Sequence, residues 1–148
     1  MPNKPSPVLL FVALVLAGFA WFGDGVPVPR QADLPIDAPG FHCVFLRERG
    51  QVISKGHAAV FGSQEVEDAA SADGGKYHVF WADQPAESIP EIYHGVVEAM
   101  RGKELPQWCL CDSTTGRSLI ASPPSTHDAV EFAVAGIQQT RGVKWSKP

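Results

Sequence analysis

The sequence has 148 residues, which is room for one domain and an appendage. Hydrophobic residues make up 45% of the chain, a fraction typical of globular proteins, and they are numerous enough to build a sizeable core. The formal net charge of −4 argues against nucleic acid as a partner, because phosphate binding needs clustered lysine and arginine.

An unbroken apolar run covers residues 8–22 and follows Lys4. A positive start, an apolar stretch and small residues are typical of a signal peptide, and Gly18 and Ala20 suit a cut after Ala20. The run is also typical of a membrane anchor, although a full span needs roughly 20 apolar residues. Residues 1–22 are therefore interpreted as either a cleaved signal peptide or a retained anchor helix. Either predicts an exported chain, which is secreted or periplasmic in the first case and membrane-anchored, facing outside the cytoplasm, in the second.

Residues 23–40 contain four prolines and little apolar periodicity. A proline-rich segment is extended and semi-rigid, so these residues are predicted to form a linker. A weak additional strand is considered at 26–28. As a tether, the segment would hold a domain on the order of 50 Å from the membrane, at about 3.1 Å per residue.

The first predicted strand covers residues 41–47, which are apolar on both alternating faces. Such a pattern indicates a strand with helices on each side of its sheet. Gly50 and Gly56 bracket a predicted loop. Ser63 is then the expected cap of a helix, and Gly74-Gly75 ends that helix.

A second strand is predicted over residues 77–81, again apolar on both faces. Ser88 and Glu91 have the spacing of a capping box at the start of the second helix, which Gly102 ends. The apolar residues of this helix recur at helical spacing, and they are Ile89, Ile92, Tyr93, Val96, Val97 and Met100.

Two more strands are predicted over residues 108–111 and 118–121, joined as a hairpin by a Thr-Thr-Gly turn at 114–116. A last helix follows Pro123-Pro124 and a cap within Ser-Thr-His-Asp at 125–128. The first two strands need a crossover connection and should be parallel, whereas the last two should be antiparallel. Residues 141–148 are expected to be a solvated tail.

This order of elements, with a proline directly before the third strand, resembles the thioredoxin-like fold over residues 41–140. Leu105-Pro106 lies where that family carries its cis-proline, and the turn at 114–116 and the Pro-Pro-Ser-Thr-x-Asp helix start match the family's closing part. The resemblance implies an α/β three-layer sandwich, βαβαββα, with a four-stranded mixed sheet behind the signal or anchor helix.

Thioredoxin-like oxidoreductases carry Cys-x-x-Cys after the first strand, where the helix start helps to stabilise a reactive thiolate. The corresponding residues 49–57 contain no cysteine, and His57 alone is weak evidence of a site. What the resemblance still implies is binding, because the backbone before the family's cis-proline pairs with an extended peptide as an added strand. The docking edge for a peptide or protein partner would be Leu105, Pro106 and Gln107.

The three cysteines, Cys43, Cys109 and Cys111, suggest an alternative function, an extracytoplasmic thiol-disulfide oxidoreductase that uses Cys109 and Cys111. In an extended strand, the Cα atoms of residues i and i+2 lie about 6.6 Å apart, at the edge of disulfide range. Buried thiols that pack as small hydrophobic groups are therefore favoured. A cross-strand disulfide from Cys43 to Cys109 or Cys111 is kept as an option in an oxidising compartment.

No metal site or cofactor is predicted, because none of the five histidines has ligand spacing and no nucleotide-binding or hydrolase motif is present. His42 and His78 are expected to be half-buried structural residues. Trp81 and Trp108 are expected in the core, and Trp145 is a further candidate for apolar contact. The sequence thus predicts a non-catalytic, exported peptide-binding or assembly module.

Overall fold

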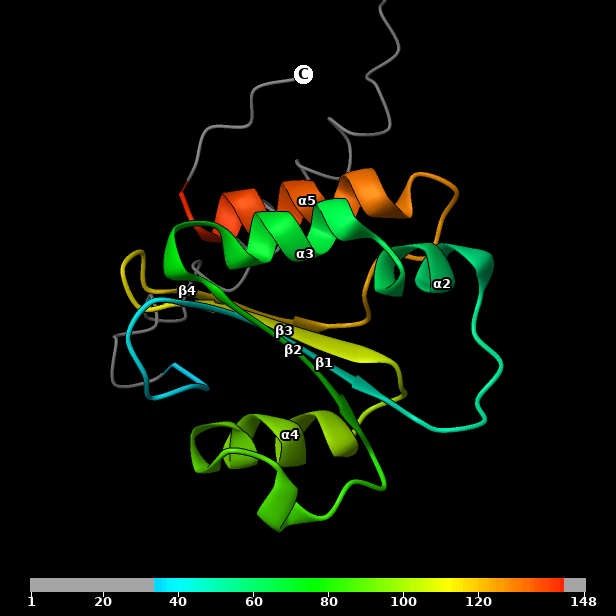
Figure 1. Ribbon diagram of the computed structural model, residues 1–148, viewed down its shortest axis with the longest axis horizontal. Helices are drawn as coiled ribbons and strands as arrows, with labels where there is room; N and C mark the ends of the chain where they lie inside the picture. The colour runs from blue at the N-terminus through cyan, green and yellow to red at the C-terminus, as the bar shows by residue number, and fades with distance from the viewer. Residues whose placement is uncertain (1–33, 143–148) are drawn as a thin grey trace, which may run out of the picture.

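The computed structural model describes residues 34–142, which form a four-stranded mixed sheet with helices on both faces (Figure 1). The strands are β1 (Phe41–Arg47), β2 (Lys76–Trp81), β3 (Gln107–Asp112) and β4 (Arg117–Ala121). The helices are α2 (Lys55–Phe61), α3 (Gln64–Ser71), α4 (His94–Arg101) and α5 (Ala129–Thr140). Figure 1 shows α2, α3 and α5 on one face of the sheet and α4 on the other. The predicted α/β class and four-stranded mixed sheet are confirmed.

The strands lie in the order β2-β1-β3-β4. β1 and β2 are parallel, whereas β3 is antiparallel to both β1 and β4. The predicted parallel first pair and the predicted hairpin are both confirmed. In this register Leu46 of β1 lies opposite Gln107 of β3 and Phe80 of β2.

Side chains of alternating strand residues form two cores, one on each face of the sheet. On the α4 face, Val44 and Leu46 pack with Val97 and Met100 of α4. On the opposite face, Phe45 belongs to the core that α3 and α5 complete; further members from those helices and from β3 are Val66, Ala133, Ile137 and Trp108. Burial on both faces explains why the strands are apolar at consecutive positions rather than at alternate ones.

The end of the predicted linker belongs to the folded domain. Leu34 and Ile36 are buried and pack into the α4-face core. Alternate apolar side chains let this short segment cover the sheet without a strand of its own. The considered strand at 26–28 and the apolar run at 8–22 lie outside the described residues. Within residues 34–142, no helix is long and apolar enough to cross a membrane.

Helix α2 begins at the end of the loop predicted between Gly50 and Gly56 and covers residues for which the sequence predicts no helix. Ser54 caps it by accepting a hydrogen bond from the His57 N–H at 3.1 Å. Gly56 in the first turn of α2 has a low helix propensity, and this is why the sequence does not predict the helix. The predicted cap of α3 is confirmed, because the Ser63 hydroxyl accepts from the Val66 N–H at 3.2 Å.

The predicted capping box at Ser88 and Glu91 is wrong, and α4 begins only at His94. The Ser88 hydroxyl donates to the Pro85 carbonyl oxygen at 2.7 Å, so it does not cap a helix. The preceding residues form short 3-10 turns at Ala86–Ser88 and Glu91–Tyr93.

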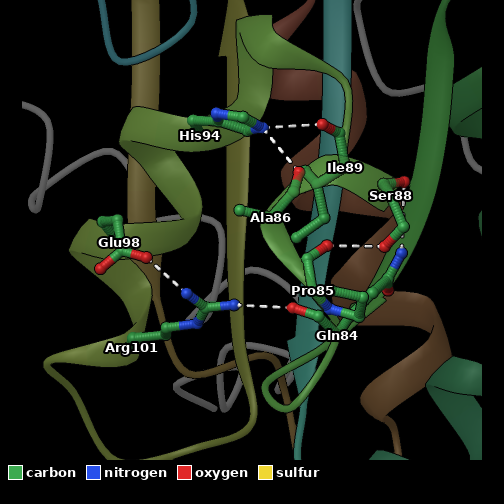
Figure 2. A network of polar contacts seen from close by, with 8 residues as sticks. All are labelled: Gln84, Pro85, Ala86, Ser88, Ile89, His94, Glu98 and Arg101. Carbon is green, nitrogen blue, oxygen red and sulfur yellow. Dashed lines mark hydrogen bonds and ion pairs between the residues drawn. The ribbon is translucent and has the colours of Figure 1, made fainter.

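Two residues of α4 hold this preceding segment (Figure 2). His94 Nε2 lies 2.9 Å from the Ala86 carbonyl oxygen and 2.7 Å from that of Ile89. Both contacts are acceptors, so Nε2 carries the proton and donates. Arg101 donates to the Gln84 carbonyl oxygen at 3.2 Å and pairs with Glu98.

The expectation of a solvated tail is wrong for its first residue. Arg141 donates to the carbonyl oxygens of Ala69, Ala70 and Ala72, at 3.0, 3.2 and 2.6 Å, and so satisfies the carboxyl end of α3. The cap residue of α5 is Asp128, which lies within the cap predicted at 125–128, but its side chain makes no capping hydrogen bond.

Candidate functional site

The predicted docking residues lie at the end of the sheet where β1 runs into the connection to α2 (Figure 1). Because β3 is antiparallel to its neighbours, the start of β3 meets the ends of β1, β2 and β4 there. We call this region the loop end, and it comprises residues 47–54, 81–83, 105–107 and 121–123.

The main chain of Leu105, a residue of the loop end, is only partly hydrogen-bonded within the described residues. Its carbonyl oxygen accepts a hydrogen bond from the Nε2 of the exposed Gln51 side chain at 2.8 Å. Its N–H has no acceptor within the described part of the chain. The Leu105–Pro106 peptide bond is cis, as the resemblance implies. Leu105 is half-buried against the α4-face core, so its backbone is held at the edge of a packed structure.

Gln107, the third predicted docking residue, is not presented to a partner. It is 4% exposed, and its Nε2 donates to the Glu104 carbonyl oxygen at 2.8 Å and to the Ser122 hydroxyl at 3.2 Å. Its Oε1 is buried and has no hydrogen-bond partner. Gln107 therefore braces the connection between α4 and β3, and Pro106 beside it is buried as well.

The connection from β1 to α2 carries an exposed apolar side chain. Val52 is 96% exposed, one residue after the Gln51 that contacts Leu105. His57 is half-buried, and its Nε2 lies 3.0 Å from the Pro123 carbonyl oxygen, which ties α2 to the connection before α5. An apolar side chain next to unused main-chain groups suits a bound peptide segment.

A group that sequence analysis missed lies beside this loop. Arg47, the last residue of β1, places its guanidinium carbon 4.1 Å from the Phe61 ring centroid and 4.9 Å from that of Trp81. Arg49 lies 4.7 Å from the Trp81 centroid and pairs with Asp83 at 2.9 Å. Trp81 was expected in the core but is only half-buried. The feature of the sequence that could have identified this group is Arg47 itself, a charged residue at the end of a mostly apolar strand.

The cysteines lie away from the loop connection and inside the two cores. Cys43 belongs to the core under α3 and α5, whereas Cys109 and Cys111 belong to the core under α4, so the sheet separates them. All three are free and buried, and none of the considered disulfides is formed. Burial raises the pKa of each thiol above its ordinary value, most strongly for Cys43 and Cys109. Protonated, buried thiols are poor nucleophiles, which is the opposite of a reactive cysteine site.

His42 and His78 also lie in the structure as buried and half-buried groups, as expected. His42 Nδ1 lies 2.8 Å from the Tyr93 hydroxyl, and its Nε2 lies 3.2 Å from the Pro39 carbonyl oxygen. His78 stacks on Phe80, and burial lowers the pKa of both histidines. Among the described residues, no group of three or more histidine, cysteine or acidic side chains could hold a metal ion.

Trp108 is buried in the core as expected, and Trp145 lies outside the described residues.

Comparison of the chain with models of protein families, with curated proteins and with solved structures gives no match. The chemistry of the loop end is therefore judged from its own groups, which are a free main-chain donor, an exposed valine and two arginines.

Proposed function

We propose that the chain is a divergent, non-catalytic member of the thioredoxin-like superfamily that binds an extended peptide segment of a partner protein. The order of elements, the strand order β2-β1-β3-β4 and the proline before β3 support the superfamily assignment. The peptide would add to the loop end as a short strand, paired with the main chain of Leu105.

The observation that carries this proposal is the state of the Leu105 main chain. Its N–H is unpaired within the described residues, and its carbonyl oxygen is bonded only to the side-chain amide of the exposed Gln51. Strand addition needs one donor and one acceptor in the same residue, and both lie here on a backbone fixed by Pro106 and β3. A peptide strand has only to displace the Gln51 side chain.

The absence of cysteine from residues 49–57 supports binding rather than dithiol chemistry. The remaining thiols are buried in the cores, with pKa values raised by desolvation. A peptide held at Leu105 would meet Val52, Arg47 at the end of β1 and Arg49 just after it, so the loop end supplies contact without a redox step.

Export completes the proposal, because residues 8–22 have the pattern of a signal peptide or an anchor. Intact mass after expression in a secreting host distinguishes the two. A product that begins at Trp21 identifies a cleaved signal peptide, and the full mass identifies a retained anchor. A full-length product recovered from the cytoplasm would contradict export.

Peptide binding is tested with a displayed library of random linear peptides, panned on the immobilised full-length protein. The substitution Leu105→Pro removes the main-chain donor, whereas Leu105→Ala keeps that donor and shortens the side chain more than proline does, so it controls for lost side-chain packing. We expect the wild type and Leu105→Ala to enrich common peptides and Leu105→Pro to lose them, with thermal unfolding confirming that both variants are folded. Enrichment of the same peptides by Leu105→Pro would overturn the proposed docking edge.

A further inference from the structure

Arg47 differs from the other arginines of the described residues in having no hydrogen-bond acceptor. Four of the five arginines between positions 34 and 142 are bonded. Arg49 pairs with Asp83 and Arg101 with Glu98, while Arg117 and Arg141 donate to main-chain carbonyl oxygens. The Nε of Arg47 is buried without a partner, as is that of Arg101, but Arg101 is bonded through its other two nitrogens, whereas Arg47 forms no hydrogen bond or ion pair within these residues. A guanidinium has five N–H donors, and a buried one left unpaired costs stability.

The Arg47 side chain is nevertheless held in a fixed position. Its guanidinium carbon lies 4.1 Å from the centroid of Phe61 and 4.9 Å from that of Trp81, within the range of cation–π attraction. A planar cation ordered by two rings loses little conformational entropy when it binds a carboxylate, which matches its fork of donors. The arrangement is that of a preformed anion site.

A second arginine adds charge at the same ring. Arg49 lies 4.7 Å from the Trp81 centroid. Its partner Asp83 forms with it an exposed ion pair, with side chains 59% and 61% exposed. Exposed pairs of this kind contribute little to stability, so an incoming carboxylate can take Arg49 from Asp83 at small cost.

The register places Arg47 beside the proposed docking edge. The pairing of β1 with β3 ends at Leu46 opposite Gln107, so Arg47 and Pro106 are the next residues of their segments at the same end of the sheet. We propose that Arg47, assisted by Arg49, binds a carboxylate side chain of the peptide that docks at Leu105. This inference rests on the proposed peptide binding and assigns its specificity to extended peptides carrying an aspartate or glutamate.

The same panning experiment tests this specificity when Arg47→Gln is compared with the wild type. Arg117→Gln is the matched control, because it removes the same charge at the start of β4, at the other end of the sheet. We expect the wild type and Arg117→Gln to enrich an acidic residue at a fixed position, and Arg47→Gln to enrich peptides without it. A selected acidic peptide should bind Arg47→Gln more weakly, by roughly tenfold to a hundredfold, the loss expected for a charge-assisted hydrogen bond.

Enriched peptides with no acidic preference would overturn the assignment of Arg47 and leave the proposed peptide binding intact. If no peptide is enriched, peptide binding fails, and the anion site is judged separately by NMR of the wild-type arginine Nε–H resonances. Titration with N-acetyl-glutamate amide should move the Arg47 resonance saturably and leave that of Arg101 in place, while N-acetyl-glutamine amide moves neither. An unmoved Arg47 resonance would overturn the site.

Discussion

Gln51 donates a hydrogen bond from its Nε2 to the Leu105 carbonyl oxygen at 2.8 Å, across 54 residues of chain. This side chain therefore takes the position that a peptide N–H would need for strand addition. The hydrogen bond is exposed to solvent, so a peptide can displace the Gln51 side chain from the docking edge at small cost.

Gln51→Ala is predicted to strengthen peptide binding. The substitution frees the Leu105 carbonyl oxygen and removes a competing bond worth about 1 kcal/mol, so the affinity of a selected peptide should rise by up to about fivefold. Fluorescence anisotropy of a labelled selected peptide measures this. Gln64→Ala is the control, because Gln64 is another exposed glutamine and bonds only to Asp68 on its own helix. Weaker binding by Gln51→Ala would show that Gln51 contacts the peptide instead.

Arg141→Ala is predicted to lower the free energy of unfolding by about 2 kcal/mol, because it removes three hydrogen bonds to carbonyl oxygens at the carboxyl end of α3. The guanidinium also lies 5.0 Å from the Phe41 ring centroid, so packing is lost with the charge. Urea unfolding followed by circular dichroism measures the change. Arg117→Ala removes one main-chain contact rather than three and should cost clearly less. Equal losses for the two variants would contradict the capping role of Arg141.

The strands were predictable because each carries its own signal. Residues 41–47 are apolar at every position up to Arg47 except His42, and β1 has the predicted bounds. Helix α2 was not predictable, because Gly56 is unfavourable in a helix and is explained only by its approach to Ser125, 69 positions later. The same limit applies to the site. Leu105 and Pro106 could be identified from their place in the order of elements. That Arg47 lacks a hydrogen-bond acceptor could not, because it depends on where the acidic side chains and carbonyl oxygens lie in the folded protein.

Acidification is predicted to destabilise the domain through His42 and His78. Burial lowers the pKa of both below the ordinary value of 6.5, so below that pH the unfolded chain binds protons that the folded chain excludes. Stability is therefore complete above about pH 6.5 and falls as the pH drops, by at most about 1.4 kcal/mol per pH unit for each histidine.

Urea unfolding at several pH values tests this assignment. His42→Phe should be less stable at neutral pH, because it loses the contact with the Tyr93 hydroxyl, but its stability should depend less steeply on pH. His127→Gln, at a side chain that is 87% exposed, should keep the wild-type slope. A wild-type slope in His42→Phe would assign the pH dependence to other groups.

The three thiols are predicted to resist alkylation in the folded protein and to react only after unfolding. All are buried and unpaired, and desolvation keeps them protonated. Mass spectrometry after iodoacetamide treatment should show little modification in buffer and three modified cysteines in denaturant without reductant. If denatured protein needs a reductant to reach full modification, a disulfide is present and the oxidoreductase alternative regains support.

Gly56 and Gly95 form a matched pair of helical glycines with opposite predicted effects. A Cβ at Gly56 would lie 2.0 Å from the Ser125 carbonyl oxygen, and this main-chain atom can yield only if the connection before α5 moves. Gly56→Ala should therefore destabilise the protein by about 2 kcal/mol or more, as overpacking does. A Cβ at Gly95 meets no atom within 4 Å, so Gly95→Ala should stabilise α4 by about 0.5–1 kcal/mol.

Urea unfolding of the two glycine variants measures both signs in one experiment. Because α2 carries His57, which contacts the Pro123 carbonyl oxygen, displacement at Gly56 should also disturb the loop end. Gly56→Ala should then weaken binding of a selected peptide, whereas Gly95→Ala should not. A stable Gly56→Ala protein with unchanged peptide affinity would show that α2 can move away from the α5 connection at no cost to the docking edge.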